Sequence, residues 1–355
     1  MTEGIVQGDC REVLAEFPEA EFDAIFADPP YNLQLRQPLY RPNQTLVDAV
    51  NDDWDKVGDF HDYDAFTREW LSACRRVLKP DGTIWVIGTY HNIFRVGSIL
   101  QDLGYWILND VVWIKTNPMP NFRGARLTNA HETLIWAAKS REAKGRLLNY
   151  KSLKAGNEDK QMRSEWVIPI CSGAERTLQN GRKAHSTQKP EALLHRVLMA
   201  CTSWGDWVLD PFVGSGTTAA VAKRLGRRCV GIEQDEGYVK VARKRLASVA
   251  RPDEALRELY EPYDEPRPLR VPFVNLVEQG VLAVGQELYF NGSPDLTARI
   301  GADGTLLAPD GARGSIHKIA GLYGSVDRLN GWTVWFYLGD SGEMVSIDGL
   351  RPHSP

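Results

Sequence analysis

The fold can be predicted from one stretch, Phe22-Asp23-Ala24-Ile25-Phe26-Ala27-Asp28-Pro29-Pro30-Tyr31. Residues 22–27 are mostly apolar and are bounded by turn signals, which is typical of a buried strand in a parallel sheet. The two prolines end the strand, and each restricts the residue before it to extended geometry. Asp28 and Tyr31 are therefore predicted to lie on a stiff turn at the carboxyl edge of a sheet, where open α/β sheets bind ligands.

This turn suits a flat substrate that carries an exocyclic amine. The ring of Tyr31 could stack on the substrate, while the Asp28 carboxylate and the proline carbonyls accept hydrogen bonds from the amine. The alternative is a strand that simply ends in a Pro-Pro turn with a surface tyrosine, and the tetrapeptide alone does not separate the two.

A second informative unit begins at Trp207-Val208-Leu209-Asp210 and ends at Glu233. The pattern is strand, Gly-containing turn, helix over about 218–225, and a second strand that ends in an acid 19 residues after Gly214. This order is typical of a nucleotide-binding βαβ unit, in which the acid accepts hydrogen bonds from ribose hydroxyls. Only Gly214 and Gly216 of the G-x-G-x-x-G pattern are present, which favours a ligand without phosphates. The alternative is an ordinary βα turn.

Charge is distributed unevenly along the 355 residues, although the formal net charge is only -4. Residues 1–60 carry 4 Lys or Arg against 13 Asp or Glu, whereas residues 115–189 carry 15 against 6. A basic block of this size in a nearly neutral protein indicates a polyanionic partner. The alternative is a solvated surface spread over several faces.

The five cysteines, at positions 10, 74, 171, 201 and 229, form no C-x-x-C pair and no metal-binding spacing. We therefore expect reduced thiols, no metal and a cytosolic environment. No stretch resembles a signal peptide or a membrane span. These observations predict a cytoplasmic protein without a membrane partner.

The remaining pattern predicts a large α/β domain over 1–250, a linker over 251–272 and a small β-rich domain over 273–355. The tail carries frequent turn dipeptides between short apolar runs, which is typical of β-hairpins. Residues 32–62 and 139–165 show no clear periodicity, with a weak helix in the second range. Helices are expected over about 11–17, 62–78, 91–103, 191–203 and 236–249, and strands over about 83–88, 106–114 and 132–138, with a turn at 79–82.

Asp28-Pro29-Pro30-Tyr31 and Asp210-Pro211-Phe212-Val213-Gly214-Ser215-Gly216 together resemble the motif pair of the amino-methylating DNA methyltransferases. The first motif precedes the second and the basic block lies between them, as in the permuted β-class. Further strings resemble the cell-cycle-regulated adenine methyltransferases of α-proteobacteria, which methylate GANTC sites: Asn117-Pro-Met-Pro-Asn-Phe122, Asn129-Ala-His-Glu132 and His185-Ser-Thr-Gln-Lys-Pro190. The tail is similar to the restriction-enzyme-and-adenine-methylase-associated domain, in Arg313-Gly-Ser-Ile-His317 and Asn330-Gly-Trp332.

This resemblance implies a Rossmann-like fold and S-adenosylmethionine as cofactor. It implies that Asp28, Pro29, Pro30 and Tyr31 form the catalytic motif, with Asp28 and the Pro29 carbonyl accepting the two N–H groups of the adenine N6 amine and Tyr31 stacking on the base. The residues implied for the cofactor are Asp9, Cys10, Asp28, Thr187, Gln188, Lys189, Asp210, Phe212, Gly214, Gly216, Thr217 and Glu233. Without the resemblance, Asp9 could be a helix cap and Lys189 a surface lysine.

Double-stranded DNA is the expected partner, with the target base flipped out of the duplex. A homodimer and association with the nucleoid are further expectations. The basic block 115–189 is expected to recognise the target through phosphate and base contacts. The tail has more acidic than basic residues, so we expect it to act through stacking and hydrogen bonds instead. The residues predicted to contact DNA are Lys115, Asn121, Arg123, Arg126, Ser315, Asn330 and Trp332.

Three other functions compete with adenine methylation. An N4-cytosine methyltransferase would use the same scaffold and nearly the same motif. A protein or RNA methyltransferase would not need both the basic block and the tail. A catalytically silent DNA-binding subunit should have lost the acid or a glycine, and here both motifs are intact.

Overall fold

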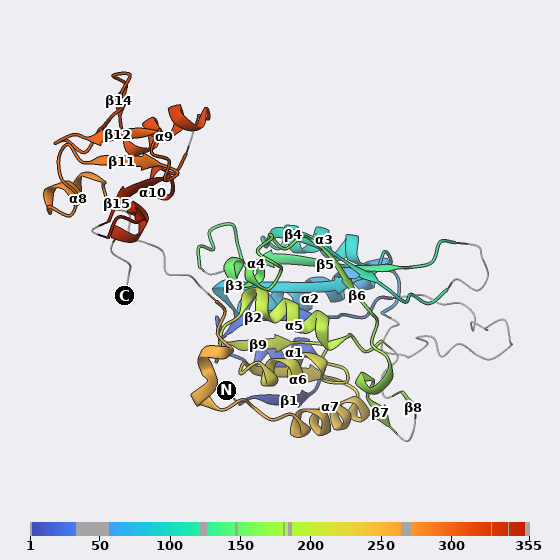
Figure 1. Cartoon of the computed structure of the whole chain (residues 1–355). Helices are drawn as coiled ribbons and strands as arrows, with labels where there is room; N and C mark the ends of the chain where they lie inside the picture. Colours follow the sequence, from blue (N-terminus) through green and yellow to red (C-terminus); the bar gives the residue numbers. More distant parts are fainter. Residues whose placement is uncertain are drawn as a thin grey trace. The chain divides into compact units, whose positions relative to one another are not determined.

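We describe a computed structural model of residues 2–32, 57–120, 126–145, 148–179, 182–183, 187–263, 271–327, 329–339 and 341–351. The chain divides into two compact units, Met1–Asp264 and Glu265–Pro355. The first unit is an α/β structure and the second is built on a small antiparallel sheet (Figure 1). The fold class therefore agrees with the one predicted from the sequence.

The described part of the first unit forms an eight-stranded mixed sheet. Five neighbouring strands run parallel, and β5 then pairs antiparallel with both β3 and β4. In spatial order, the strands are β1 (Gly4–Gln7), β10 (Arg228–Glu233), β9 (Trp207–Asp210), β2 (Phe22–Ala27), β3 (Leu78–Gly88), β5 (His131–Ala138), β4 (Trp106–Lys115) and β6 (Glu165–Ile168).

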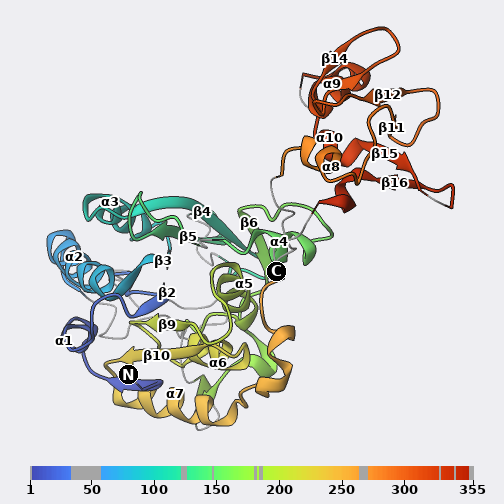
Figure 2. The same cartoon turned by 90° about the vertical axis from the view of Figure 1, so that its left-hand side faces the viewer.

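Helices cover both faces of this sheet (Figure 2). One face packs against α1 (Cys10–Ala15), α2 (Phe60–Val77) and α3 (Ile93–Asp102). The other packs against α5 (Glu191–Cys201), α6 (Thr217–Arg224) and α7 (Glu236–Ser248). Shorter elements are α4 (Tyr150–Ala155), the hairpin of β7 (Leu178–Gln179) and β8 (Arg182–Lys183), and the 3-10 helices η2 (Gly173–Glu175) and η3 (Glu254–Leu259).

The strand β2 is buried because it lies in the middle of the sheet between two helical layers. It pairs in parallel with β3 on one side and β9 on the other, and Ala24, Ile25 and Ala27 are almost fully buried. A strand covered on both faces needs apolar side chains throughout. This confirms the interpretation of residues 22–27. The carboxyl ends of β1, β10, β9 and β2 consequently meet at one edge of the sheet.

The structure differs from the sequence prediction at two strands. Strand β3 begins at Leu78, which pairs with Phe22, and the register then shifts so that Thr83 pairs with Ala24. The turn predicted at 79–82 is therefore an irregularity within the strand. Strand β6 was not predicted, because its four residues are too few for a recognisable period and it lies at the edge of the sheet, where β4 is its one partner among the described strands.

The described part of the second unit contains a six-stranded antiparallel sheet and short helices. The strands in spatial order are β14 (Arg313–Gly314), β13 (Leu306–Leu307), β12 (Thr297–Ile300), β11 (Glu287–Phe290), β15 (Trp335–Leu338) and β16 (Met344–Ser346). The helices are α8 (Val274–Glu278), α9 (Ile316–Gly324), α10 (Gly331–Val334) and the 3-10 helix η4 (Ile347–Leu350). Its core centres on the fully buried Trp335, whose indole N–H donates to the Ile316 carbonyl at 2.9 Å.

None of the helices among the described residues combines the length and apolar character that a membrane span requires. All five cysteines are buried free thiols.

Candidate active site

A pocket of about 340 Å³ opens at the edge of the sheet where the parallel strands end. A volume of this size is in the range of small-molecule and cofactor sites. The pocket brings together turns that are up to 225 residues apart in the chain, because parallel strands end on the same side. Of the residues predicted from the sequence, its lining includes Asp9, Cys10, Asp28, Pro29, Pro30, Tyr31, Thr187, Gln188, Lys189, Asp210, Phe212, Gly214, Thr217 and Glu233.

Hydrogen bonds from α2 and from the segment that follows β3 hold the turn after β2 in place. The Tyr63 hydroxyl of α2 donates to the Pro30 carbonyl at 2.8 Å. The side-chain amide of Asn92 donates to the Tyr63 oxygen at 3.1 Å, and its carbonyl accepts from the Thr89 N–H at 3.0 Å. This chain of contacts links the end of β3 to the Pro-Pro turn. The position of Asp28 is thus fixed by packing as well as by proline stiffness.

Asp28 lies in a buried group of charged side chains. Lys189 Nζ donates to Asp28 Oδ2 at 2.6 Å and lies 3.8 Å from Glu132 Oε2. The Tyr31 hydroxyl lies 2.9 Å from Asp28 Oδ1 and 3.0 Å from Glu132 Oε2. On the far side, Lys115 Nζ pairs with Glu132 Oε1 at 2.7 Å. Among the described residues, the group therefore contains two carboxylates, two ammonium groups and one phenol.

The pairing of strands explains why these side chains meet. Strand β2 runs parallel to β3, and β5 runs antiparallel to β3 with Gly88 opposite Thr133. The start of β5, including Glu132, therefore lies at the edge where β2 ends. Lys115 ends the neighbouring strand β4, and its N–H donates to the Ala130 carbonyl at 2.8 Å.

The two buried acids are shifted in opposite directions. Burial raises the pKa of Asp28 above its usual range, although the Lys189 cation acts against this. Burial also acts to raise the pKa of Glu132, but the two cations Lys189 and Lys115 outweigh it and the pKa is lowered. For Lys189, burial is outweighed by the neighbouring carboxylates, and its pKa is raised. The environment therefore favours protonation of Asp28 and ionisation of Glu132.

The βαβ unit predicted from the sequence is confirmed, with β9, α6 and β10 in that order. Glu233 at the end of β10 accepts from the Gly214 N–H at 3.0 Å and from the Asp235 N–H at 2.8 Å. The carboxylate thereby fixes the turn after β9. Gly214 has a φ of 51°, a left-handed conformation that glycine adopts without strain.

Gly216 does not line the pocket, although it was predicted to bind the cofactor. It precedes α6 with a φ of 81°, and a Cβ at this position would lie 3.1 Å from Ala242 of α7. Its small size is required for packing between α6 and α7, and the adjacent Ser215 lines the pocket in its place.

The pocket is suited to a ligand that carries positive charge. Asp28, Asp210 and Glu233 all line it, and burial raises the pKa of each. For Asp210 the pKa rises to about 7. A nearby cation would lower these values and reduce the repulsion between the acids. A sulfonium and an α-amino group supply such charge, so the residues present fit S-adenosylmethionine.

The other predicted cofactor residues have identifiable structural partners. Asp9 caps α1 and forms an ion pair with Arg11 at 2.6 Å. Asp9 also lines the pocket, so its role as a helix cap does not exclude contact with the cofactor. Gln188 bridges the Thr177 N–H and the Glu175 carbonyl at 2.9 and 3.0 Å. Lys189 is 6 % exposed, which excludes the surface role that was its alternative.

Two of the residues predicted to contact DNA from the first unit, Lys115 and Arg126, lie among the described residues. Lys115 forms an ion pair with Glu132 inside the protein, so the prediction that it contacts a DNA phosphate is wrong. Arg126 is exposed and donates from Nη1 to the hydroxyl of the exposed Tyr90 at 2.9 Å. Asn121 and Arg123 lie outside the described residues.

In the second unit, the structure corrects the prediction for Trp332. Its ring is 7 % exposed and packs edge-on against Phe273 with centroids 5.8 Å apart. A ring in this position serves the core and offers no face for stacking on a base. Ser315 and Asn330 are exposed, and their side chains cap α9 and α10.

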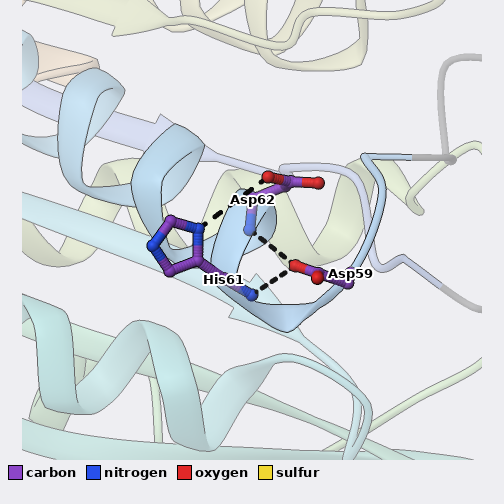
Figure 3. Close-up of side chains that lie close together, drawn as sticks. All are labelled: Asp59, His61 and Asp62. Atoms are coloured by element: carbon purple, nitrogen blue, oxygen red, sulfur yellow. Dashed lines mark hydrogen bonds and ion pairs between the residues drawn. The ribbon is translucent and has the colours of Figure 1, made fainter.

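An exposed group of Asp59, His61 and Asp62 lies at the start of α2 (Figure 3). Asp59 Oδ1 accepts from the N–H groups of His61 and Asp62 at 2.8 and 3.0 Å. These are the contacts of a helix N-cap. The His61 Nδ1 lies 3.9 Å from Asp62 Oδ1, and we assign the group to capping.

Sequence reasoning gave no role to Glu132 or Tyr63. An acid at the start of the apolar run 132–138 was a usable signal for Glu132, because a buried acid requires partners. Tyr63 gave no signal, since its contact with Pro30 depends on how α2 packs under β2.

The mixed sheet, the acid-lined pocket and the rigid Asp28 turn define an S-adenosylmethionine-dependent methyltransferase. The model of the DNA methylase family matches residues 22–244. The Type II methyltransferase M.HinfI of Haemophilus influenzae is 45% identical over 348 residues, covering 98% of this chain and 95% of its own. M2.DpnII of Streptococcus pneumoniae is 42% identical over 242 residues, covering 68% and 88%. The chain belongs to the DNA methylase family and is a DNA methyltransferase.

Solved structures agree with this assignment. The M1.HpyAVI complex with SAM has 26% identity and a TM-score of 0.52, and the match covers 68% of this chain and 98% of that one. The cytosine-N4-specific PvuII DNA methyltransferase has 21% identity and a TM-score of 0.54, with coverage of 73% and 92%, and it shows similarity of fold alone.

Proposed function

We propose that this methyltransferase transfers a methyl group to N6 of a flipped-out adenine, with GANTC as the recognition sequence. The observation that supports this proposal is the Asp28 carboxylate, which lines the cofactor pocket, has a raised pKa and is ion-paired to Lys189. The similarity of the Asn117–Phe122 and His185–Pro190 strings to the GANTC-specific, cell-cycle-regulated enzymes supports the choice of base and context.

The reacting nitrogen needs help because its lone pair is delocalised into the purine ring. Hydrogen bonds from its two N–H groups to the Asp28 carboxylate and the Pro29 carbonyl favour a pyramidal nitrogen. The carboxylate also stabilises the positive charge that develops during attack. The ring of Tyr31 lies in the same turn, and we assign to it the stacking on the base. Bound S-adenosylmethionine supplies the electrophilic methyl group, and no covalent enzyme intermediate is needed.

DNA binding is assigned to two parts of the chain. In the first unit, the basic block 115–189 supplies cations for phosphate contacts, including the exposed Arg126 beside Tyr90. Lys115 and Lys189 belong to the buried group and do not take part. The second unit contributes exposed hydrogen-bonding groups, among them Ser315 and Asn330. The domain limits 1–250, 251–272 and 273–355 remain part of this proposal, as do a homodimer and a cytoplasmic, nucleoid-associated location.

The deciding experiment incubates the full-length protein with labelled S-adenosylmethionine and duplexes that carry one GANTC site. Digestion to nucleosides and mass spectrometry then identify the methylated base. We expect N6-methyladenine in GANTC and none in a GTNAC control. N4-methylcytosine would support the competing specificity, and incorporation of no label into any duplex would support a silent DNA-binding subunit. Chelating agents should leave the rate unchanged.

A further inference from the structure

The phenol of Tyr31 lies between two carboxylates but has one proton to share between them. Its oxygen is 2.9 Å from Asp28 Oδ1 and 3.0 Å from Glu132 Oε2, both hydrogen-bond distances. A phenol donates one hydrogen bond and ionised carboxylates only accept. Both contacts can be well-formed hydrogen bonds at once only when one carboxyl group carries a proton. The group can therefore take up one proton without a movement of heavy atoms.

We propose that Tyr31 and Glu132 form a proton switch that enables Asp28 to accept the proton released by the substrate amine. Before transfer, the phenol donates to Asp28. As the nitrogen–carbon bond forms and the sulfur–carbon bond breaks, one amine proton passes to the Asp28 carboxylate. Protonated Asp28 donates to the Tyr31 oxygen, and the phenol proton turns to Glu132. Asp28 loses its proton to solvent after the product leaves. This inference rests on the proposed methylation of an exocyclic amine.

The charges of the site are consistent with such a switch. Asp28 and Glu132 are balanced by Lys189 and Lys115, so these four described side chains together carry no net charge before reaction. Methyl transfer removes the positive charge of the sulfonium, and the proton on Asp28 replaces it. The net charge of the enclosed site is thereby conserved, which matters because a change in buried charge is costly. Burial raises the pKa of Asp28, which favours direct proton acceptance, whereas Lys189 and Lys115 lower the pKa of Glu132.

Glu132 is a positioning residue in this scheme, and Lys115 makes it testable. Lys115 Nζ donates to Glu132 Oε1 at 2.7 Å, and an ammonium group can only donate. In Glu132→Gln, the amide oxygen must therefore face Lys115 and the NH₂ group must face Tyr31. The Tyr31 phenol can then donate its proton only to Asp28, while glutamine keeps the size and shape of the original side chain.

The first test measures single-turnover methylation by Glu132→Gln in the full-length protein. We expect a rate about 100-fold lower, in line with typical contributions of acid–base groups. The acid limb of its pH–rate profile should shift to lower pH. Cofactor affinity, and fluorescence of 2-aminopurine at the target position, should stay within threefold of wild type. Asp102→Asn, an exposed carboxylate paired with Arg68, is the matched control and should leave all readouts unchanged. A Glu132→Gln rate within threefold of wild type, or an unshifted acid limb, would overturn the proposal.

The second test uses Tyr31→Phe and the cofactor-free protein. A phenol that only donates to Asp28 would lower the pKa of that carboxyl, so its removal would raise the pKa. In the proposed switch, the Tyr31 oxygen also stabilises protonated Asp28 by accepting its proton. We therefore expect the pKa of Asp28 in Tyr31→Phe to stay level or fall. Infrared titration of the carboxyl band, identified by its loss in Asp28→Asn, measures this. A rise would overturn the proposal even if the methylated base is as proposed. Tyr31→Phe/Glu132→Gln should be no slower than the slower single variant, because groups that act as a unit are non-additive.

Discussion

At the scale of single residues, the pocket is lined by acids whose burial disfavours the charged form and raises the pKa. Asp28 has cationic and phenolic partners within 3 Å, whereas Asp210 has only hydrogen bonds, such as that from the Phe212 N–H at 3.0 Å. Both residues lie at the ends of neighbouring parallel strands. Lys189 and Tyr31 lower the pKa of Asp28 against the effect of burial, whereas Asp210 has no cation among its hydrogen-bond and ion-pair contacts in the described part of the chain and its pKa rises to about 7.

Asp28→Asn should reduce the methyl-transfer rate by about 10²–10³-fold or more, because the amide loses the charge that stabilises the transition state. The amide keeps the size of the side chain, so affinity for S-adenosylmethionine should stay within threefold. Single-turnover assays and calorimetric titration check the two effects. A rate within tenfold of wild type would contradict the role given to Asp28.

Asp210→Asn should stabilise the ligand-free protein at pH 8 but not at pH 4. The folded-state pKa of about 7 lies above the usual 3.8, so the folded protein binds this proton more tightly than the unfolded chain does. The stability contributed by this proton is present at low pH and is lost as pH rises through about 7. Three pH units correspond to an upper limit of about 4 kcal/mol. Chemical denaturation at both pH values measures the difference, and an equal effect at both would contradict the burial argument.

At the scale of elements, the turn between β9 and α6 is the part that most directly forms the cofactor site. The Gly214 N–H is held by Glu233 from the end of β10, and α6 then begins with Thr217 at the pocket wall. Sequence spacing predicted this unit well, because strand, turn and helix are adjacent in the chain and depend on local contacts.

Gly214→Val and Glu233→Ala should each weaken S-adenosylmethionine binding by about tenfold or more. The first places a β-branched side chain where φ is 51°, and the second removes the acceptor that fixes the turn. The recognition sequence should not change in either variant. Calorimetric titration with the cofactor decides the point, and unchanged affinity in both variants would place the cofactor elsewhere.

At the scale of the whole molecule, each of the two units has a hydrophobic core built from its own residues. The first unit packs its helices on both faces of the mixed sheet, whereas the second encloses Trp335 and Trp332. The match to M.HinfI covers 98% of this chain and therefore includes the second unit. A protein without the second unit should accordingly keep its cofactor pocket.

Removal of residues 265–355 should leave S-adenosylmethionine affinity within threefold and weaken DNA binding about tenfold or more. The reason is that the pocket is formed within the first unit, while the exposed groups of the second are proposed to hold DNA. Fluorescence anisotropy with a GANTC duplex tests the second part. A truncated protein that binds and methylates like the intact one would show that the tail is dispensable.

Trp332→Ala should act through stability and not through a lost base contact. Truncation of a buried tryptophan costs about 3–5 kcal/mol, so the second unit is expected to unfold selectively. Exposed residues provide the comparison, since Ser315→Ala removes only a cap and about 1 kcal/mol. Differential scanning calorimetry separates the two outcomes, and a folded second unit with specific loss of DNA affinity in Trp332→Ala would restore the stacking role.

The amino-acid pattern was enough to predict the βαβ unit, the strand before Asp28, the acid-and-glycine turns and the two-part organisation of the chain. These features are encoded by short-range periodicity and by turn residues whose geometry is local. The tertiary structure was needed to show that Glu132 is linked to Asp28 through Tyr31 and Lys189, that Lys115 pairs with Glu132, that Trp332 is buried and that Gly216 serves helix packing. Those facts depend on strand order and on antiparallel pairing between β3, β5 and β4. Asp28 and Glu132 lie 104 positions apart, and no local signal in the chain shows that both contact Tyr31 and Lys189, because that arrangement arises from sheet topology.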